Sequence, residues 1–321
     1  MDASRLAAPW RPRRAPGRSG RLTLVTAGRY APSPTSALHL GNLRTAVVAW
    51  LMARGTGRRF WLRIEDLDVA RVAAAGPVAE GQLADLAALG LDFDPPAMWQ
   101  SARLDAYQEA AGLLSDRLYE CFCTRREIAE AASAPHDGFR PYPGTCRGLS
   151  EAEREQRRRS RPPALRIRAD AATCTVTDIW AGEVSGVVDD FVVRRNDGVW
   201  AYNFAVVVDD LAQGVDQVIR GDDLLSSAPR QAWLTQQLGG EPPRYGHVPL
   251  AVNRAGTRLA KRDGAVTLAD LAARGVTADQ VLSMLAASLA LAAPGEPVTA
   301  AELLRRWDPA RLPLAPWLVD G

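Results

Sequence analysis

Three cysteines lie in a short stretch of the chain, with a spacing suited to metal binding. Cys121 and Cys123 are one residue apart and Cys146 follows, while the fourth cysteine stands alone. Tetrahedral zinc needs a fourth ligand, and His136 is the ordinary chemical choice. Three buried cysteines without metal are the alternative. The odd, clustered pattern favours a metal site over a disulfide framework and predicts a reducing, cytoplasmic location.

The segment His39-Leu40-Gly41-Asn42 has the residue types of a phosphate-binding turn. It lies where a loop after a predicted strand becomes a helix, and amides, a glycine and an imidazole donor there suit a nucleotide triphosphate. The alternative is that His39 and Asn42 only cap the helix. The chain has neither a Walker glycine loop nor a GxGxxG fingerprint, which excludes those two nucleotide-binding modes.

Lys261 is the single lysine among 39 basic residues, and the other 38 are arginine. A compact ammonium on a flexible stem is a suitable movable donor to phosphate, whereas arginine is a rigid planar donor. Codon bias could also leave one lysine by accident.

The chain has 321 residues, of which 47% are hydrophobic and 24% charged, a composition typical of a globular protein. The helices and strands expected to position these residues alternate along it. Strand, helix, strand and helices in this order predict an α/β fold with a doubly wound parallel sheet. We expect a strand at 24–27, a loop at 29–35, a helix ending near 55, a strand at 60–64, helices at 78–89 and 104–118, strands at 165–168, 187–193, 199–208 and 218–221, and a helix at 227–238.

The boundaries of the expected parts follow changes in composition. We expect a disordered Arg/Pro-rich tail at 1–22, the first half of a catalytic domain at 23–118, a proline-rich zinc-binding knuckle at 119–149, the rest of the catalytic domain at 150–262 and a helical C-terminal region at 263–321. Ser150 with Glu153 and Thr277 with Gln280 predict capped helix starts.

The overall charge does not indicate nucleic-acid binding, but two arginine-rich segments do. The net charge is +2, residues 1–22 hold six arginines against one acid, and 147–168 hold eight arginines against three glutamates. These two segments could bind RNA phosphates, and a solvated helix followed by a strand is the alternative for the second. No apolar stretch is long enough to cross a bilayer, so we expect no membrane association.

Several ordered motifs together resemble one family. The segments 28–35 (GRYAPSPT), 39–42 (HLGN), 62–66 (LRIED), 202–205 (YNFA), 206–210 (VVVDD), 218–223 (VIRGDD) and 258–262 (RLAKR) resemble the catalytic domain of glutamyl-tRNA synthetase. The resemblance implies a class I synthetase fold in which 39–42 and 258–262 enclose ATP, and an adenylation that needs no protein nucleophile. The enzyme aligns the reactants and neutralises phosphate charge.

The resemblance also implies roles for individual residues. His39 and Lys261 would be the catalytic donors, and ATP with Mg²⁺ would bind at His39, Gly41, Asn42, Lys261 and Arg262. The glutamate site would hold Arg29, Ser33, Glu65, Tyr202 and Arg220, with Asp66 or Asp209 orienting them. Arg29 and Arg220 could bind the two carboxylates of the substrate glutamate, and Glu65 could bind its ammonium group. A Tyr-x-x-x-Cys pattern makes Tyr142 the expected fourth zinc ligand beside Cys121, Cys123 and Cys146.

Only 59 residues follow Arg262, which is short for a helical anticodon-binding region. The chain therefore resembles the truncated glutamyl-Q tRNA(Asp) synthetases. That resemblance implies glutamate activation without tRNA and transfer to queuosine at the wobble position of tRNA(Asp), by a cytoplasmic enzyme expected to be a monomer. A short enzyme aminoacylating tRNA(Glu) and a noncatalytic tRNA-binding protein are the alternatives.

Lys261→Ala is expected to lower glutamate-dependent exchange of pyrophosphate into ATP by on the order of 100-fold, because a phosphate donor is lost. The melting temperature should stay unchanged. Near-normal exchange would remove Lys261 from the mechanism.

Overall fold

The computed structural model describes residues 26–68, 72, 75–124, 126–128, 142–254, 256 and 266–319. In chain order its main elements are β1 (Ala27–Tyr30), α1 (Leu40–Gly55), β2 (Arg59–Ile64), α2 (Ala75–Ala88), β3 (Asp94–Trp99), α3 (Leu104–Leu113), β4 (Leu118–Cys121), α5 (Glu151–Arg158), β5 (Ala164–Ile167), β6 (Ala172–Asp178), β7 (Gly182–Val188), β8 (Val192–Arg194), α6 (Tyr202–Gln213), β9 (Gln217–Gly221), α7 (Ala228–Gln237), β10 (Arg244–Val248), β11 (Ala251–Val252), α8 (Leu268–Ala273), α9 (Ala278–Ser288), α10 (Ala300–Arg306) and β12 (Trp317–Leu318).

The central strands are parallel and form two adjoining groups. One has the order β3-β2-β1 and the other β9-β10-β6-β7, in which only β7 runs antiparallel to its neighbour. The groups meet at β1 and β9, where Ala27 bridges to Val215 in parallel and accepts a hydrogen bond from the amide of Asp216. This order of parallel strands is typical of a doubly wound sheet.

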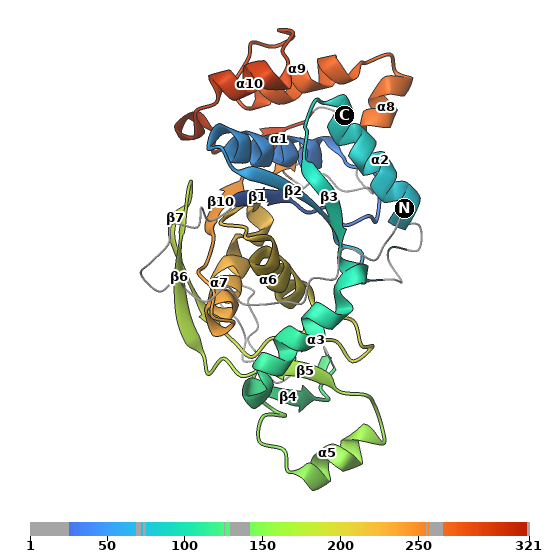
Figure 1. The fold of residues 1–321 in the computed structure, drawn as a ribbon, viewed down its shortest axis with the longest axis vertical. Coiled ribbons are helices and arrows are strands. Elements are labelled where there is room, and N and C mark those ends of the chain that lie inside the picture. The colour runs from blue at the N-terminus through green and yellow to red at the C-terminus, as the bar shows by residue number, and fades with distance from the viewer. Residues whose placement is uncertain are drawn as a thin grey trace.

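Helices cover both faces of the sheet, and each face has its own hydrophobic core. One core joins α1 and α2 to the C-terminal helices α8, α9 and α10, and the other joins α3, α6 and α7. Figure 1 shows α8–α10 beyond α1 at one end of the molecule. The predicted α/β fold with a doubly wound parallel sheet is confirmed.

The segment around the cysteines lies at the opposite end from α9 and α10 (Figure 1). There β4, β5 and β8 form a small antiparallel sheet, and α5 follows Ser150. The Ser150 hydroxyl accepts from the Glu153 amide while the Glu153 carboxylate accepts from the Ser150 amide, so the predicted capping box is present. The Thr277 and Gln280 capping box at the start of α9 is present too.

The strand predicted at 199–208 was wrong, because residues from Tyr202 onward form helix α6. The valines 206–208 are all buried in the core under the sheet. Residues 204–210 of this helix are all buried, so its run of valines cannot be told from a buried strand by hydrophobic pattern alone. The turn at 196–198 is present, and Gly198 has a positive φ of 87°.

Other boundaries differ from the sequence-based expectation for local reasons. The strand predicted at 187–193 is two strands, β7 and β8, interrupted by Asp189 and Asp190. The helix predicted at 104–118 ends at Leu113. Strand β1 extends into the predicted loop as far as Tyr30. Strands β3, β6 and β10 were not predicted, because prolines in β3 and short apolar runs in β10 obscure the strand pattern.

No helix in the described ranges is long and apolar enough to cross a membrane. The expected tail at 1–22 lies outside the described residues.

Gly28→Ala is expected to destabilise the fold by about 1–3 kcal/mol, because the new methyl would lie 2.9 Å from Cβ of Ala53 where β1 packs on α1. Urea unfolding measures the change. Gly112→Ala is the matched control: a Cβ in that exposed part of α3 meets nothing within 4 Å, so stability should rise by up to about 1 kcal/mol. Equal stability of wild type and Gly28→Ala would contradict the tight packing.

Candidate active site

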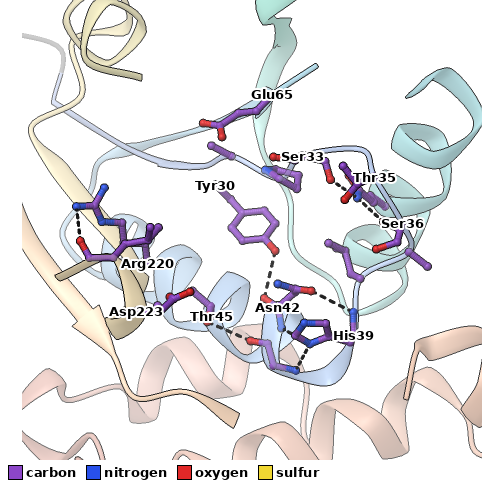
Figure 2. A pocket seen from close by; sticks show the side chains of 18 of the residues that line it. Tyr30, Ser33, Thr35, Ser36, His39, Asn42, Thr45, Glu65, Arg220 and Asp223 are labelled. Carbon is purple, nitrogen blue, oxygen red and sulfur yellow. Dashed lines mark hydrogen bonds between the residues drawn. The ribbon is translucent and has the colours of Figure 1, made fainter. Parts of the chain in front are cut away.

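A cleft of about 790 Å³ opens at the carboxyl ends of β1 and β9. Strand β1 leads into α1 on one face of the sheet, and β9 leads into α7 on the other. The two connections therefore diverge and leave a crevice between them, the usual ligand site of an open α/β sheet. Figure 2 shows this crevice with Glu65 and Arg220 on its walls and His39 and Asn42 at the start of α1.

Eight of the predicted site residues line this one cleft, although they come from four separate stretches of sequence. They are Arg29, Ser33, His39, Gly41, Asn42, Glu65, Tyr202 and Arg220. Lys261 and Arg262 lie outside the described residues, as does the alternative zinc ligand His136.

His39 caps the N-terminus of α1. Its Nδ1 accepts hydrogen bonds from the amides of Gly41 and Asn42 at 3.1 and 3.3 Å, and the Asn42 side chain accepts from the His39 amide. The alternative capping role is therefore real, and both side chains also line the cleft. Because Nδ1 accepts, the ring proton of neutral His39 is on Nε2, which can donate to an anion.

Arg220 is a buried cation whose hydrogen-bond partners among the described residues are all neutral. It is 5% exposed, and it donates to Nε2 of His247 at 3.0 Å, to Oε1 of Gln231 at 2.6 Å and to the carbonyl of Leu224 at 3.1 Å. Within the described part of the chain no carboxylate oxygen lies within 4.0 Å of its guanidinium nitrogens. Three of its five N–H groups are committed, so one remains on each terminal nitrogen for an anion.

Glu65 is a carboxylate of the cleft whose side chain is 10% exposed. Burial raises its pKa to about 7, and the attraction of Arg63 and Arg29 only partly opposes that rise. Loss of hydration disfavours the charged form of a carboxyl group, so a ligand cation beside Glu65 would restore the carboxylate.

A charged group missed by the sequence analysis lies beneath the cleft. Arg63 on β2 is fully buried, with Nη1 2.7 Å from Asp210 Oδ1, Nη2 3.6 Å from Glu65 Oε1 and Nε 3.8 Å from Asp209 Oδ2. Arg29 Nε lies 3.5 Å from the same Asp210 oxygen. An arginine between Leu62 and Ile64 in a buried strand was the available signal, because such a charge needs buried partners.

Asp66 and Asp209, the two residues expected to orient the site, hold the segment that follows β3. Asp66 accepts from the amide and hydroxyl of Ser101, and Asp209 accepts from Gln100, Arg103 and Tyr107. Neither lines the cleft, and Asp209 is fully buried.

The predicted metal ligands converge at the other end of the molecule. The Sγ atoms of Cys121, Cys123 and Cys146 all lie within 4.8 Å of one another, and the Tyr142 hydroxyl is 3.4 and 3.7 Å from the first two. Zinc–sulfur bonds of about 2.3 Å place sulfurs roughly 3.8 Å apart in a tetrahedron. The Phe122 amide also points at Cys146 Sγ, at 3.4 Å, so the donor set and its surroundings fit a small thiophilic cation.

Most arginines expected to form a basic stripe at 147–168 have local partners. Arg147 pairs with Asp190 and Asp170, and Arg158 contacts three glutamates. Helix α5 buries no residue. These contacts favour the solvated-helix interpretation for that part of the segment.

Comparison with known proteins agrees with this geometry. The family model of the tRNA synthetases class I (E and Q), catalytic domain, matches residues 25–307. The chain belongs to this family. As a class I tRNA synthetase it is a ligase, and enzymes of this class use ATP.

Two similar relatives of this class I synthetase share one name. The glutamyl-Q tRNA(Asp) synthetase of Nocardia farcinica is 56% identical over 92% of this chain and 94% of its own, and that of Cutibacterium acnes is 56% identical over 84% and 78%. A glutamate tRNA ligase from Elizabethkingia meningosepticum, in complex with its amino acid, is 26% identical with a TM-score of 0.74 over 92% of this chain and 67% of that one.

Arg63→Met is expected to destabilise the protein by about 3–5 kcal/mol, because it removes the buried cation that Asp209, Asp210 and Glu65 share. Urea unfolding measures it. Arg305→Met is the control: this side chain is 70% exposed with one pair at 4.0 Å, so the change should stay within about 0.5 kcal/mol. Similar losses for both variants would contradict a central role for Arg63.

Proposed function

We propose that this enzyme activates glutamate with ATP in the absence of tRNA and transfers the glutamyl group to queuosine at the wobble position of tRNA(Asp). The observation that carries the proposal is Arg220, a buried cation in the cleft whose partners in the described ranges are all neutral. Such a group requires an anionic ligand. Two relatives that are each 56% identical are named glutamyl-Q tRNA(Asp) synthetase, which supports glutamate and tRNA(Asp) as substrates.

The cleft suits the three charges of glutamate. The two remaining N–H groups of Arg220 can bind a carboxylate with both oxygens, as a planar guanidinium does best. Glu65 offers a carboxylate for the ammonium, and Arg29 adds a second cation on the same wall. Ser33 and Tyr202 supply hydroxyl groups at the cleft surface. Glutamine lacks the negative charge that Arg220 needs, so the same site would reject it.

ATP would bind across the start of α1. Nε2–H of His39 can donate to a phosphate, Gly41 allows close approach, and the helix N-terminus favours negative charge. Lys261 and Arg262 would complete the phosphate site, and Mg²⁺ enters bound to ATP. Asn42 lines the same side of the cleft.

The chemistry balances without a protein nucleophile. An α-carboxylate oxygen of glutamate attacks the α-phosphorus of ATP, the bond to the β-phosphate breaks, and pyrophosphate leaves with that electron pair. A hydroxyl of queuosine then attacks the carbonyl carbon of the mixed anhydride, its proton is released, and AMP leaves. The protein contributes alignment and charge neutralisation in both steps.

The cysteine cluster would hold a structural zinc ion with Cys121, Cys123, Tyr142 and Cys146 as ligands. All four positions are filled by the protein, which is typical of a structural rather than a catalytic site. Bound zinc would fasten β4 to the segment that precedes α5.

We also propose that the chain is divided into five parts, with the boundaries 1–22, 23–118, 119–149, 150–262 and 263–321. We further propose that the enzyme is a monomer located in the cytoplasm. Elution volume in gel filtration with light scattering tests the oligomeric state.

The deciding experiment is exchange of pyrophosphate into ATP by the purified full chain without tRNA, with glutamate, aspartate and glutamine compared. Exchange with glutamate alone supports the proposal. Exchange that needs added tRNA would favour an enzyme that aminoacylates tRNA(Glu), and no exchange under either condition would favour a noncatalytic tRNA-binding protein. Transfer is then measured with radioactive glutamate on tRNA(Asp) with and without queuosine.

The KM for glutamate is expected to be about tenfold higher at pH 6 than at pH 8. The carboxylate form of Glu65 binds the ammonium, and its raised pKa of about 7 means that acid protonates it in this range. Affinity is thus present above pH 7 and is lost as the pH falls. Glu65→Gln should raise KM at every pH and remove the slope, while a flat wild-type profile would contradict this role.

Wild-type protein is expected to carry about one zinc ion per chain by plasma mass spectrometry, and Cys146→Ala should lose it. Cys174→Ala is the matched control, since Cys174 lies in another core. Tyr142→Phe should lower zinc retention and His136→Ala should not. The reverse result would make His136 the fourth ligand.

A further inference from the structure

A row of three buried side chains crosses three neighbouring strands behind the cleft. Asp178 at the end of β6 meets His247 on β10, and His247 meets Arg220 on β9. Oδ2 of Asp178 is 2.6 Å from Nδ1 of His247, and Nε of Arg220 is 3.0 Å from Nε2. Asp178 and His247 are 2% and 4% exposed, and neither lines the cleft.

The partners of the histidine decide where its proton is. The Nε–H of Arg220 can only donate, so Nε2 of His247 must present its lone pair. The proton of the neutral ring is then on Nδ1 and is donated to Asp178. Burial lowers the pKa of His247, the hydrogen bond to Asp178 opposes that change and the positive charge of Arg220 adds to it, and the net lowering favours the neutral ring that accepts from Arg220.

We propose that Asp178 and His247 are positioning residues that hold Arg220 in the orientation in which it binds the side-chain carboxylate of the amino acid. This inference rests on the proposed function. A neutral acceptor on Nε fixes the plane of the guanidinium without satisfying its charge. A carboxylate in the place of His247 would pair with Arg220 and compete with the substrate.

The other groups around His247 are compatible with this arrangement. Tyr245 stacks on the imidazole with ring centroids 6.1 Å apart. Asp222, from the segment after β9, and Arg29, from β1, carry opposite charges that interact with His247 at longer range. None of them replaces the hydrogen bond to Nε of Arg220.

Asp178→Asn tests the pair with a change of one atom. Oδ1 of Asp178 accepts from the amides of Trp180 and Ala181, both at 2.9 Å, so an amide side chain would keep its oxygen there. Its NH₂ group would then face Nδ1 of His247 and force the ring proton onto Nε2. Two donors would meet between His247 and Arg220, the wrong-tautomer effect that such a substitution has in hydrolase triads.

Two substitutions at His247 give a matched pair. His247→Gln can accept from Arg220 with its amide oxygen and donate to Asp178 with its NH₂ group. His247→Leu can do neither. A positioning role predicts that glutamine retains glutamate affinity within about tenfold, whereas leucine loses as much as Asp178→Asn.

Kinetics and NMR on the full chain test the inference together. Asp178→Asn is expected to raise the KM for glutamate by roughly 10- to 100-fold, the range for a buried charged donor that faces another donor. The KM for ATP should change by less than about twofold. The chain has three histidines, so ¹⁵N spectra assigned with His39→Gln and His136→Gln report the tautomer of His247 directly.

The spectra should show an Nδ1-protonated His247 in the wild type and an Nε2-protonated ring in Asp178→Asn. A wild-type ring protonated on Nε2, or a switched tautomer with an unchanged KM for glutamate, would overturn the inference. If the leucine and glutamine variants lose equal affinity, the role is overturned as well. Absence of wild-type exchange with any amino acid would instead overturn the proposed function, while the spectra still decide whether Asp178 sets the tautomer.

Discussion

The rest of the site depends on one buried guanidinium. Arg63 is fully buried at the end of β2, and a charge there is tolerable only because Asp209 and Asp210 on α6 face it. Those acids also reach outward, Asp210 to Arg29 and Asp209 to the segment that leads into α3. A single electrostatic requirement thus ties a strand from the first half of the chain to a helix from the second, directly beneath the cleft.

Two charged groups that line the cleft, Arg220 and Glu65, are not fully neutralised by the described part of the protein. Arg220 is held by a histidine, an amide and a carbonyl, all of them neutral. Glu65 is close enough to Arg63 to be oriented, yet burial still raises its pKa to about 7. Both groups are therefore poorly satisfied until opposite charges arrive. An amino acid with an anionic side chain brings both of those charges at once.

The two ends of the molecule are connected to this centre by polar contacts as well as by packing. Arg44, buried in α1, donates to the Pro249 carbonyl after β10 and to Ser288 in α9, so the C-terminal helices brace the helix whose N-terminus lines the cleft. At the other end Asp189 accepts from the Tyr142 amide and from Arg230, which is next to the Gln231 that holds Arg220. A single residue, Asp189, therefore links the cysteine cluster to α7, the helix that supports the cleft.

Sequence alone determined the fold class and most of the cleft lining, because the ordered motifs at 28–35, 39–42 and 218–223 keep their local form as a strand end, a capped helix start and a strand. It failed where consecutive residues of a helix are all buried, as in 204–210 of α6. Tertiary structure decided what depends on partners far apart in the chain: which acids neutralise Arg63, and that His247 and Asp178 stand behind Arg220. Spacing along a chain cannot reveal such pairs, since strand order and side-chain direction set them only after the sheet has formed.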